Sequence, residues 1–290
     1  MRFGIMTPIV SRNPRHDPPA WEAVGTVEDL VTVAKTAEDL GYDLMTFPEH
    51  VAVPADVAPA RGATYWAPLP TMGYLAAVTE RLRLVTYVLV LGYHHPLELT
   101  KSYGTLDRLC RGRVVLGVGV GSLEPEFELL GAPFAGRGDR ADDALRALRA
   151  SFGNDRPAYH GSHYDYEGFV TDPSGLDRRL TVWVGGRTAR SLRRALELGD
   201  GWAPFGLLPP AVADLLKGVD RPSGFDLVLA PEPPIQPVLE PEHVRDTVGR
   251  YSDVGASHLI FRFRQQSLRE LTEEMAALME LFPEARAEPQ

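Results

Sequence analysis

Short apolar runs rich in β-branched residues recur along the chain, and each is followed by a polar or glycine-rich turn and then by an amphipathic stretch. The segment VEDLVTVAKTAEDLG is the clearest predicted helix, because its apolar residues share one face and Gly41 stops it. The runs predicted to be strands are 2–8, 43–50, 81–92, 114–121, 181–186, 201–206, 226–230 and 258–263. Further helices are expected near 70–79, at 97–109 and 139–150, from near Thr188, Pro210 and Pro241, and at 267–282.

Near-continuous apolar strands joined by helical crossovers are typical of a parallel sheet covered by helices. Eight strand–helix units in about 250 residues fit a closed (β/α)8 barrel better than an open sheet. Because no linker rich in Pro, Ser or Gly separates the fourth unit from the fifth, we expect one domain over 1–290. The predicted fold is therefore a single α/β TIM barrel with loop insertions at its C-terminal face.

Active sites of such barrels lie at the C-terminal ends of the strands, so the loops that follow strands are expected to carry the chemistry. The insertion 151–180 follows a helix instead, and its segment GSHYDYEG is predicted to be a hairpin near the opposite face. His160 and His163 are therefore interpreted as surface residues. The loops after strands hold the aromatic residues expected to line an apolar substrate pocket: Trp21, Tyr65, Trp66 and Tyr93.

Composition narrows the possible functions. The net charge of −9 leaves no basic footprint for nucleic acid. No apolar run approaches the roughly 20 residues that span a bilayer, and the first residues lack the regions of a signal peptide, so we expect a cytoplasmic protein without a membrane partner. Cys110 is the only cysteine, which excludes an internal disulfide, and we expect it to be a buried structural thiol.

Four segments, in this order, resemble the luciferase-like monooxygenase superfamily, and within it the group of oxidoreductases that depend on coenzyme F420. They are 37–51, 84–121, 134–149 and 182–204. The resemblance implies the barrel predicted above, with a deazaflavin or flavin ring across its mouth and the cofactor phosphate near the fifth and sixth strands. It also implies a homodimer.

Glu49 and His50 end the second predicted strand and match the acidic–His pair that the family places beside the ring. We expect both to be catalytic, since a histidine there can hydrogen-bond a ring carbonyl or relay a proton near neutral pH. The alternative is a histidine that only orders the loop. Many relatives have Asp at the position of Glu49.

Other cofactor contacts are expected from the resemblance. Relatives form a bulge, often with a non-proline cis peptide, at the position of Thr86, Tyr87 and Val88. Gly121 and Ser122 lie at the barrel mouth, whereas tight packing accounts equally well for Gly117 and Gly119. Gly185, Gly186, Arg187 and Thr188 combine a helix N-terminus with a guanidinium, an anion site assigned to the cofactor phosphate and completed by Phe205 and Gly206. Thr188 could also be a plain N-cap.

His94 and His95 are adjacent, but no nearby Asp, Glu or Cys completes a ligand set, and we expect no metal. Salt bridging is the preferred interpretation of Arg137 and Arg140. The chain is thus predicted to be an oxidoreductase that uses coenzyme F420 for hydride transfer with a small organic substrate.

The arginine-rich composition is typical of GC-rich bacteria, many of which make F420, and favours the deazaflavin over a flavin. Two alternatives stay open: an FMN-dependent monooxygenase of the same superfamily supplied by a separate reductase, and a non-catalytic protein that binds a flavin or deazaflavin. A glycosidase barrel needs two carboxylates at strand ends, and only Glu49 is well placed.

Overall fold

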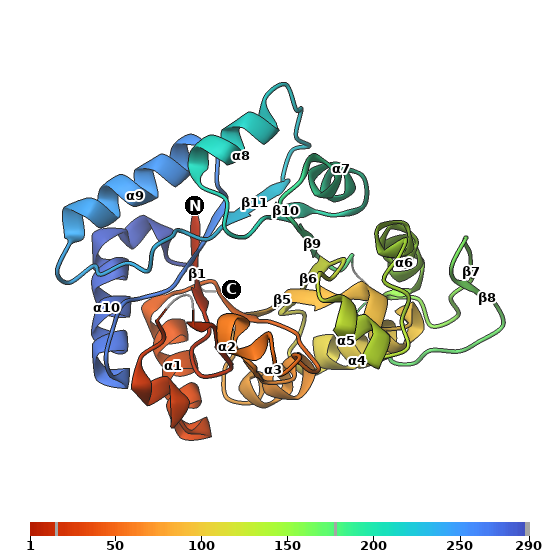
Figure 1. Cartoon of the computed structure of the whole chain (residues 1–290), viewed down its shortest axis with the longest axis horizontal. Coiled ribbons are helices and arrows are strands. Elements are labelled where there is room, and N and C mark those ends of the chain that lie inside the picture. The colour runs from red at the N-terminus through yellow and green to blue at the C-terminus, as the bar shows by residue number, and fades with distance from the viewer. Residues whose placement is uncertain (15–16, 177–178, 288–290) are drawn as a thin grey trace.

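The computed structural model describes residues 1–14, 17–176 and 179–287. Parallel strands close into a barrel in the order β1, β12, β11, β10, β9, β6, β5 and β3 (Figure 1). Their bounds are β1 Arg2–Met6, β3 Leu44–Phe47, β5 Arg83–Val90, β6 Val114–Gly119, β9 Val182–Gly185, β10 Gly201–Ala203, β11 Asp226–Leu229 and β12 His258–Phe261. The predicted (β/α)8 fold class is confirmed, and each strand falls within a predicted run.

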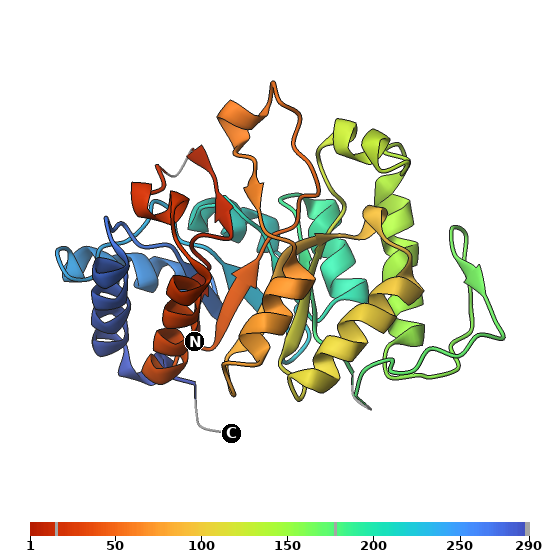
Figure 2. The ribbon, with the colours of Figure 1, turned by 90° about the horizontal axis from the view of Figure 1, so that it is seen from below.

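Helices surround the barrel, and the loops after the strands gather at one end of it (Figure 2). The covering helices are α1 Val27–Leu40, α3 Pro68–Ala76, α4 Pro96–Leu109, α6 Arg137–Ser151, α7 Ala189–Leu198, α8 Pro209–Leu216, α9 Pro241–Asp253 and α10 Leu268–Leu281. The mouth loops hold β2 Ser11–Arg12, η2 Ala20–Ala23, α2 Ala58–Arg61, β4 Thr64–Tyr65, η3 Leu91–Tyr93 and α5 Glu124–Leu129, and η4 Pro283–Ala285 follows α10. Within the described ranges, no helix is both long and apolar enough to cross a membrane.

Local signals explain the ends of α1. Thr26 caps its N-terminus and forms a capping box with Asp29, in which each side chain accepts a hydrogen bond from the other residue's backbone N–H. Gly41 ends the helix in the left-handed conformation at φ 86°. The helix is thereby held at both ends.

Alternating side chains build two apolar layers. Along β5, Val85 joins an inner cluster that fills the barrel, whereas its neighbour Leu84 joins the outer core between strands and helices. Trp183 is the largest side chain of the inner cluster and is fully buried. The interior of the barrel is therefore filled by side chains below its mouth.

The hairpin predicted for GSHYDYEG is present as β7 (Tyr159–His160) and β8 (Asp165–Tyr166), but the prediction that it lies near the opposite face is wrong. Its turn packs against the side of α6, where the carboxylate of Asp143 accepts hydrogen bonds from the backbone N–H groups of His163 and Tyr164 at 2.6 and 3.0 Å. The hairpin extends along the flank of the barrel (Figure 2). His160 and His163 are exposed, as predicted.

Candidate active site

A histidine and a buried carboxylate form the best-ordered polar pair at the barrel mouth. His50 follows β3, and its Nδ1 lies 2.7 Å from Oε2 of Glu126 on α5. Only 1% of Glu126 is exposed. Its carboxylate also accepts hydrogen bonds from the backbone N–H groups of Val51 and Ala52, at 2.5 and 3.1 Å, and from the Tyr93 hydroxyl at 2.7 Å. A buried carboxylate with four donors is fully satisfied.

The hydrogen bonds of Glu126 determine the state of His50. Burial raises the pKa of the Glu126 carboxyl, but the bonds from Tyr93, His50 and the loop backbone outweigh it and lower that pKa below its usual range. An ionised carboxylate only accepts, so Nδ1 of His50 carries a proton. Nε2 makes no hydrogen bond to the residues that the structure describes. Tyr65 packs edge-on against the imidazole, at 4.6 Å between ring centroids, and holds its plane.

Glu126 was missed in the sequence analysis. Glu124, Glu126 and Glu128 alternate within α5, and only the middle one is buried. The available signal was its place directly before the core residue Phe127 in a loop that follows a strand. That signal gives burial, but it does not give the partner, which lies 76 residues away along the chain.

Glu49 contacts the scaffold with both carboxylate oxygens. Oε2 accepts from the backbone N–H of Val90 at 2.6 Å, and Oε1 is 2.8 Å from Nε2 of His94. His94 also lies 3.2 Å from Glu98. Burial lowers the pKa of His94, but its bonds to Glu49 and Glu98 outweigh burial and raise that pKa to about 9. Glu49 therefore ties the end of β3 to the end of β5, and its catalytic role stays a prediction.

The expected bulge is present on β5. The register with β6 shifts between Thr86 and Leu89, and the Tyr87–Val88 peptide is cis. Thr86 donates a 2.8 Å hydrogen bond to the carbonyl of Gly117, whose missing side chain makes room: a Cβ there would lie 2.0 Å from the Thr86 carbonyl oxygen. Close packing within the protein thus accounts for this glycine.

The side chains of Val88 and Tyr87, both in the bulge, have different surroundings. The Val88 side chain occupies the space over two glycines, since a Cβ on Gly119 or Gly185 would lie 2.7 or 2.9 Å from its methyl carbons. Tyr87 packs on the inner cluster, and its buried hydroxyl has no hydrogen-bond partner in the described part of the chain. A buried donor without a partner is costly, which marks this place as one where a polar group is missing.

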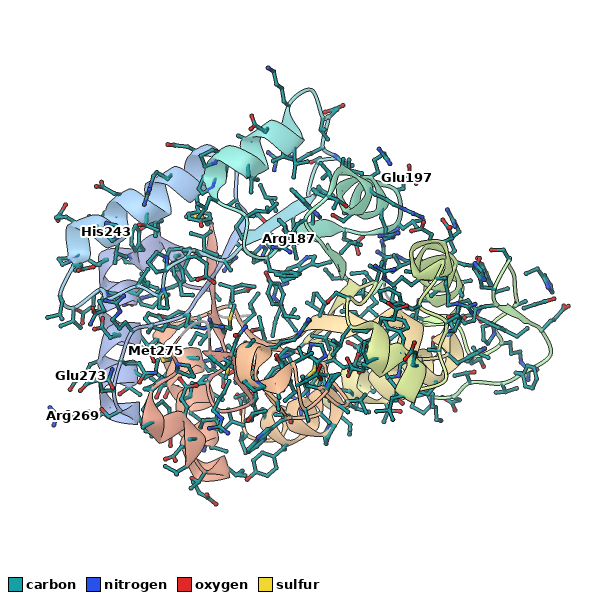
Figure 3. The ribbon with its side chains drawn as sticks, in the orientation of Figure 1. Arg187, Glu197, His243, Arg269, Glu273 and Met275 are labelled. Carbon is teal, nitrogen blue, oxygen red and sulfur yellow. The ribbon has the colours of Figure 1, made fainter. Side chains whose placement is uncertain are left out.

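The residues of the predicted anion site lie together around the start of α7. Thr188 caps the helix and forms a capping box with Ser191, so the N-cap interpretation is correct and leaves the first helical N–H groups available. Arg187 is exposed, and its guanidinium carbon lies 5.2 Å from the centroid of the Phe205 ring. A Cβ on Gly206 would be 3.9 Å from Arg187. Arg187 lies toward the centre of the molecule (Figure 3).

The remaining glycines of the predicted contacts shape this rim. Gly186 adopts φ 112°, a conformation open to glycine, and its carbonyl accepts a hydrogen bond from the Trp202 indole at 3.1 Å. Gly121 has φ 76°, and its carbonyl accepts from Arg137 at 3.1 Å. Arg137 thus bonds carbonyl oxygens, and among the described residues it forms none of the salt bridges expected for it. Ser122 accepts a 3.1 Å hydrogen bond from Arg61.

The four predicted pocket aromatics separate into groups. Tyr65 and Tyr93 gather around His50 and Glu126. Trp66 packs against the outer core. The Trp21 indole donates a 2.5 Å hydrogen bond to Gln265, which lines a cavity of about 470 Å³ at the C-terminal ends of β1, β11 and β12.

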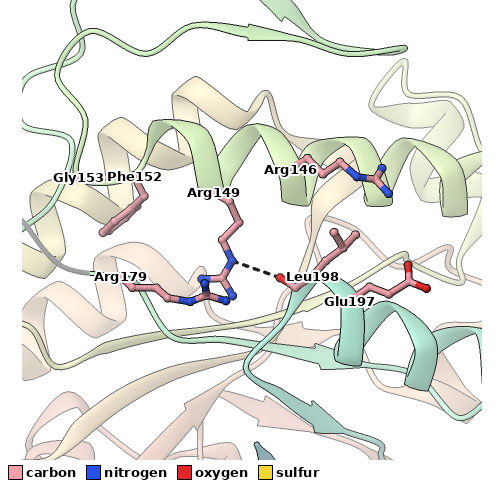
Figure 4. A pocket seen from close by; sticks show the side chains of 7 residues that line it. All are labelled: Arg146, Arg149, Phe152, Gly153, Arg179, Glu197 and Leu198. Carbon is pink, nitrogen blue, oxygen red and sulfur yellow. Dashed lines mark hydrogen bonds between the residues drawn. The ribbon is translucent and has the colours of Figure 1, made fainter. Parts of the chain in front are cut away.

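A second cavity, of about 630 Å³, lies at the other end of the barrel between the ends of α6 and α7 (Figure 4). Two of the arginines that line it, Arg149 and Arg179, make hydrogen bonds and ion pairs within the protein. Arg149 donates to the carbonyls of Leu180 and Leu198 at 2.5 and 3.2 Å and pairs with Asp200 at 2.6 Å. Arg179 shares the same carboxylate. These contacts fasten the loop before β9, and the cavity lies far from the strand ends where the chemistry is expected.

His94 and His95 make different contacts. His94 bridges two glutamates, and His95 caps α4 by accepting a 3.2 Å hydrogen bond from the backbone N–H of Leu97. In the portion of the chain that is described, no group of three or more His, Cys, Asp or Glu side chains is placed to hold a metal ion.

The mouth of the parallel barrel thus carries a carboxylate-bound histidine, a strand bulge and a helix N-terminus flanked by an arginine. The chain belongs to the luciferase-like monooxygenase family, whose defining sequence pattern matches residues 1–220. This confirms the resemblance predicted from the sequence.

Named relatives agree with that assignment. An uncharacterized protein of Mycobacterium tuberculosis is 32% identical over 212 residues, covering 69% of this chain and 73% of its own. An F420-dependent glucose-6-phosphate dehydrogenase of Microbacterium testaceum is 29% identical over 181 residues, 60% of this chain and 51% of the relative. A monooxygenase from Streptomyces bottropensis has the same fold, with a TM-score of 0.78 and 18% identity over 99% of this chain and all of its own.

Proposed function

We propose that this protein binds coenzyme F420 and exchanges a hydride between it and a small organic substrate. The observation that carries the proposal is the His50–Glu126 pair, in which a buried carboxylate fixes one ring nitrogen and the other makes no hydrogen bond to the described part of the chain. The F420-dependent relative supports the deazaflavin over a flavin.

The residues present fit such a cofactor. Arg187 is exposed, and within the described residues it has no carboxylate partner within ion-pair distance. With the N–H groups at the start of α7 it would hold the phosphate. The unpaired buried hydroxyl of Tyr87 lies on the bulge that would face the ring system. A candidate phosphate site and an unsatisfied donor are thus both found among the residues predicted to contact the cofactor.

When bound, the reduced deazaflavin supplies a hydride, or the oxidised form accepts one. The chain supplies orientation and proton transfer. Because Glu126 keeps the proton on Nδ1 of His50, neutral His50 presents Nε2 as a hydrogen-bond acceptor and protonated His50 presents it as a donor. Nε2 can therefore hold the proton that must enter or leave the substrate as hydride moves, which is general acid–base catalysis.

Cofactor identity is tested first by titrating the protein into F420 and, separately, into FMN while following fluorescence quenching. We expect saturable quenching of F420. Tight binding of FMN with no response to F420 would instead support the two-component monooxygenase. The role of His50 is tested with His50→Ala: turnover of a panel of alcohols, enones and imines is expected to fall about a hundredfold or more while F420 binding is kept.

Two outcomes contradict the proposed roles. Undiminished turnover by His50→Ala would remove the histidine from catalysis. Binding of F420 by the unchanged protein without turnover of any member of the panel would favour the non-catalytic carrier.

A further inference from the structure

The cavity at the ends of β1, β11 and β12 contains a guanidinium whose hydrogen-bonding capacity is largely unused among the described residues. Arg262 follows β12 and lines this cavity of about 470 Å³, a volume suited to a small organic ligand. Its Nη1 is buried and has no hydrogen-bond partner in the described residues, where Nη2 donates to the thioether sulfur of Met6. A thioether is a weak acceptor, so the guanidinium is left largely unsatisfied.

A second unsatisfied donor lies beside it. Thr7 follows β1 directly, lines the same cavity and is 3% exposed, and its Oγ1 has no partner among the described residues. Since β1 and β12 are paired, with Ile5 opposite Phe261, the two strand ends deliver Thr7 and Arg262 to the same wall. A buried donor without a hydrogen-bond partner destabilises the protein, and two such donors on one wall indicate a ligand rich in acceptors.

The cavity also limits how much negative charge a ligand can carry. Glu22 and Glu232 line it together with Asp17, Arg262 and Arg264, and both glutamates act electrostatically on Arg262. The two oxygens of Glu22 are engaged, since Oε2 accepts from the backbone N–H of Ile9 at 3.4 Å and Oε1 from Gln265 at 3.1 Å. Nearby carboxylates repel a phosphate dianion more than a monoanion, so the arrangement favours a single carboxylate over a phosphate.

We infer that Arg262 binds the carboxylate of the substrate, so that the proposed hydride transfer acts on a small carboxylic acid. The guanidinium fork matches a carboxylate in two parallel hydrogen bonds. Tyr65 connects this wall to the proposed proton donor, because its ring packs on His50 and its hydroxyl interacts electrostatically with Arg262. The apolar part of the acid would lie against Pro8, Pro233 and Phe263. The inference rests on the proposed function for the reaction, but the carboxylate site is testable without the cofactor.

Calorimetric titration with benzoate and octanoate, each compared with its uncharged amide, tests the site. The unchanged protein is expected to bind at least one of the two acids and neither amide. Arg262→Gln is expected to weaken binding of that acid about tenfold or more. The matched control is Arg269→Gln, which removes one positive charge at the edge of the molecule and should bind within twofold of the parent (Figure 3). If Arg262→Gln fails to fold, Arg262→Lys keeps the charge without the fork and should also weaken binding.

Three results would overturn the inference: binding of neither acid at millimolar concentration, equal binding of acid and amide, or equal binding by parent and Arg262 variants. F420 quenching on the same samples separates it from the proposed function. Retained F420 binding with no carboxylate binding defeats the inference alone. Carboxylate binding that depends on Arg262, in a protein that quenches no F420, defeats the proposed function and supports the site.

Discussion

His50 and Glu126 face each other at 2.7 Å across the barrel mouth, and the carboxylate that fixes the imidazole also holds the backbone of the loop after β3. Replacing Glu126 by Gln therefore should affect both the histidine and the fold. We expect the unfolding free energy in urea to fall by about 1–3 kcal/mol, because buried donors lose a charged acceptor.

Nitrogen NMR of labelled histidine should at the same time show His50 losing its single Nδ1–H tautomer. Glu128→Gln is the matched control on the same helix. Because that side chain is exposed, the unfolding free energy should change by no more than about 0.5 kcal/mol, and His50 should keep its single tautomer. An unchanged tautomer in Glu126→Gln would contradict the orienting role.

The ion pairs of His94 predict an unusual titration. Its folded pKa of about 9 lies above the ordinary value, so the stability it contributes is fully present below pH 6.5 and is lost as the pH rises through 9. Glu49→Gln should lower the NMR midpoint of His94 more than Glu98→Gln, because Glu49 is 8% exposed and Glu98 is 53% exposed and screened by water. A midpoint near 6.5 in the parent protein would refute the assignment.

The opposite shift is expected at the N-terminal end of the barrel. His258 lies among Asp43, Arg83 and Asp226, and burial lowers its pKa to about 4 against partial compensation by the aspartates. Between pH 6.5 and 4, His258 is therefore protonated in the unfolded chain but neutral in the folded one. The free energy of unfolding should decline as the pH falls through this range, by at most about 3 kcal/mol. His258→Gln should flatten that part of the urea-unfolding profile, and a slope equal to that of the parent would contradict the prediction.

Val88 and Gly119 offer a steric test of the bulge. Gly119→Ala places a Cβ 2.7 Å from the Val88 methyl carbon, so we expect a loss of about 1–3 kcal/mol of unfolding free energy. Combining it with Val88→Ala should recover much of that loss in a double-mutant cycle. Additive effects of the two substitutions would show that they do not meet.

Arg187 is expected to act on the cofactor phosphate alone. Arg187→Gln should weaken F420 binding about tenfold without changing the melting temperature, because the side chain is exposed, and it should leave binding of a phosphate-free deazaflavin unchanged. Arg193→Gln, exposed on the helix that follows Arg187, is the control. Equal weakening for both deazaflavins would place Arg187 away from the phosphate.

Local sequence patterns were sufficient for the barrel, since each barrel strand lies in a short, largely apolar run and helix ends such as Gly41 carry their own stop signal. They were insufficient wherever a position depends on a distant partner. Glu126 became visible only through His50, and Arg262 only through the cavity that β1 and β12 form together. The hairpin was misplaced for the same reason, because Asp143 on α6 holds it on the flank.

Glu126 also limits how the loops of this barrel can be exchanged. A single carboxylate joins the loop after β3, the η3 turn through Tyr93, and α5. These three segments therefore depend on one another, and replacing any one of them alone with the corresponding segment of a relative would break a hydrogen bond to Glu126. Engineering of new specificity should transplant them together, or confine changes to the wall formed by β1, β11 and β12.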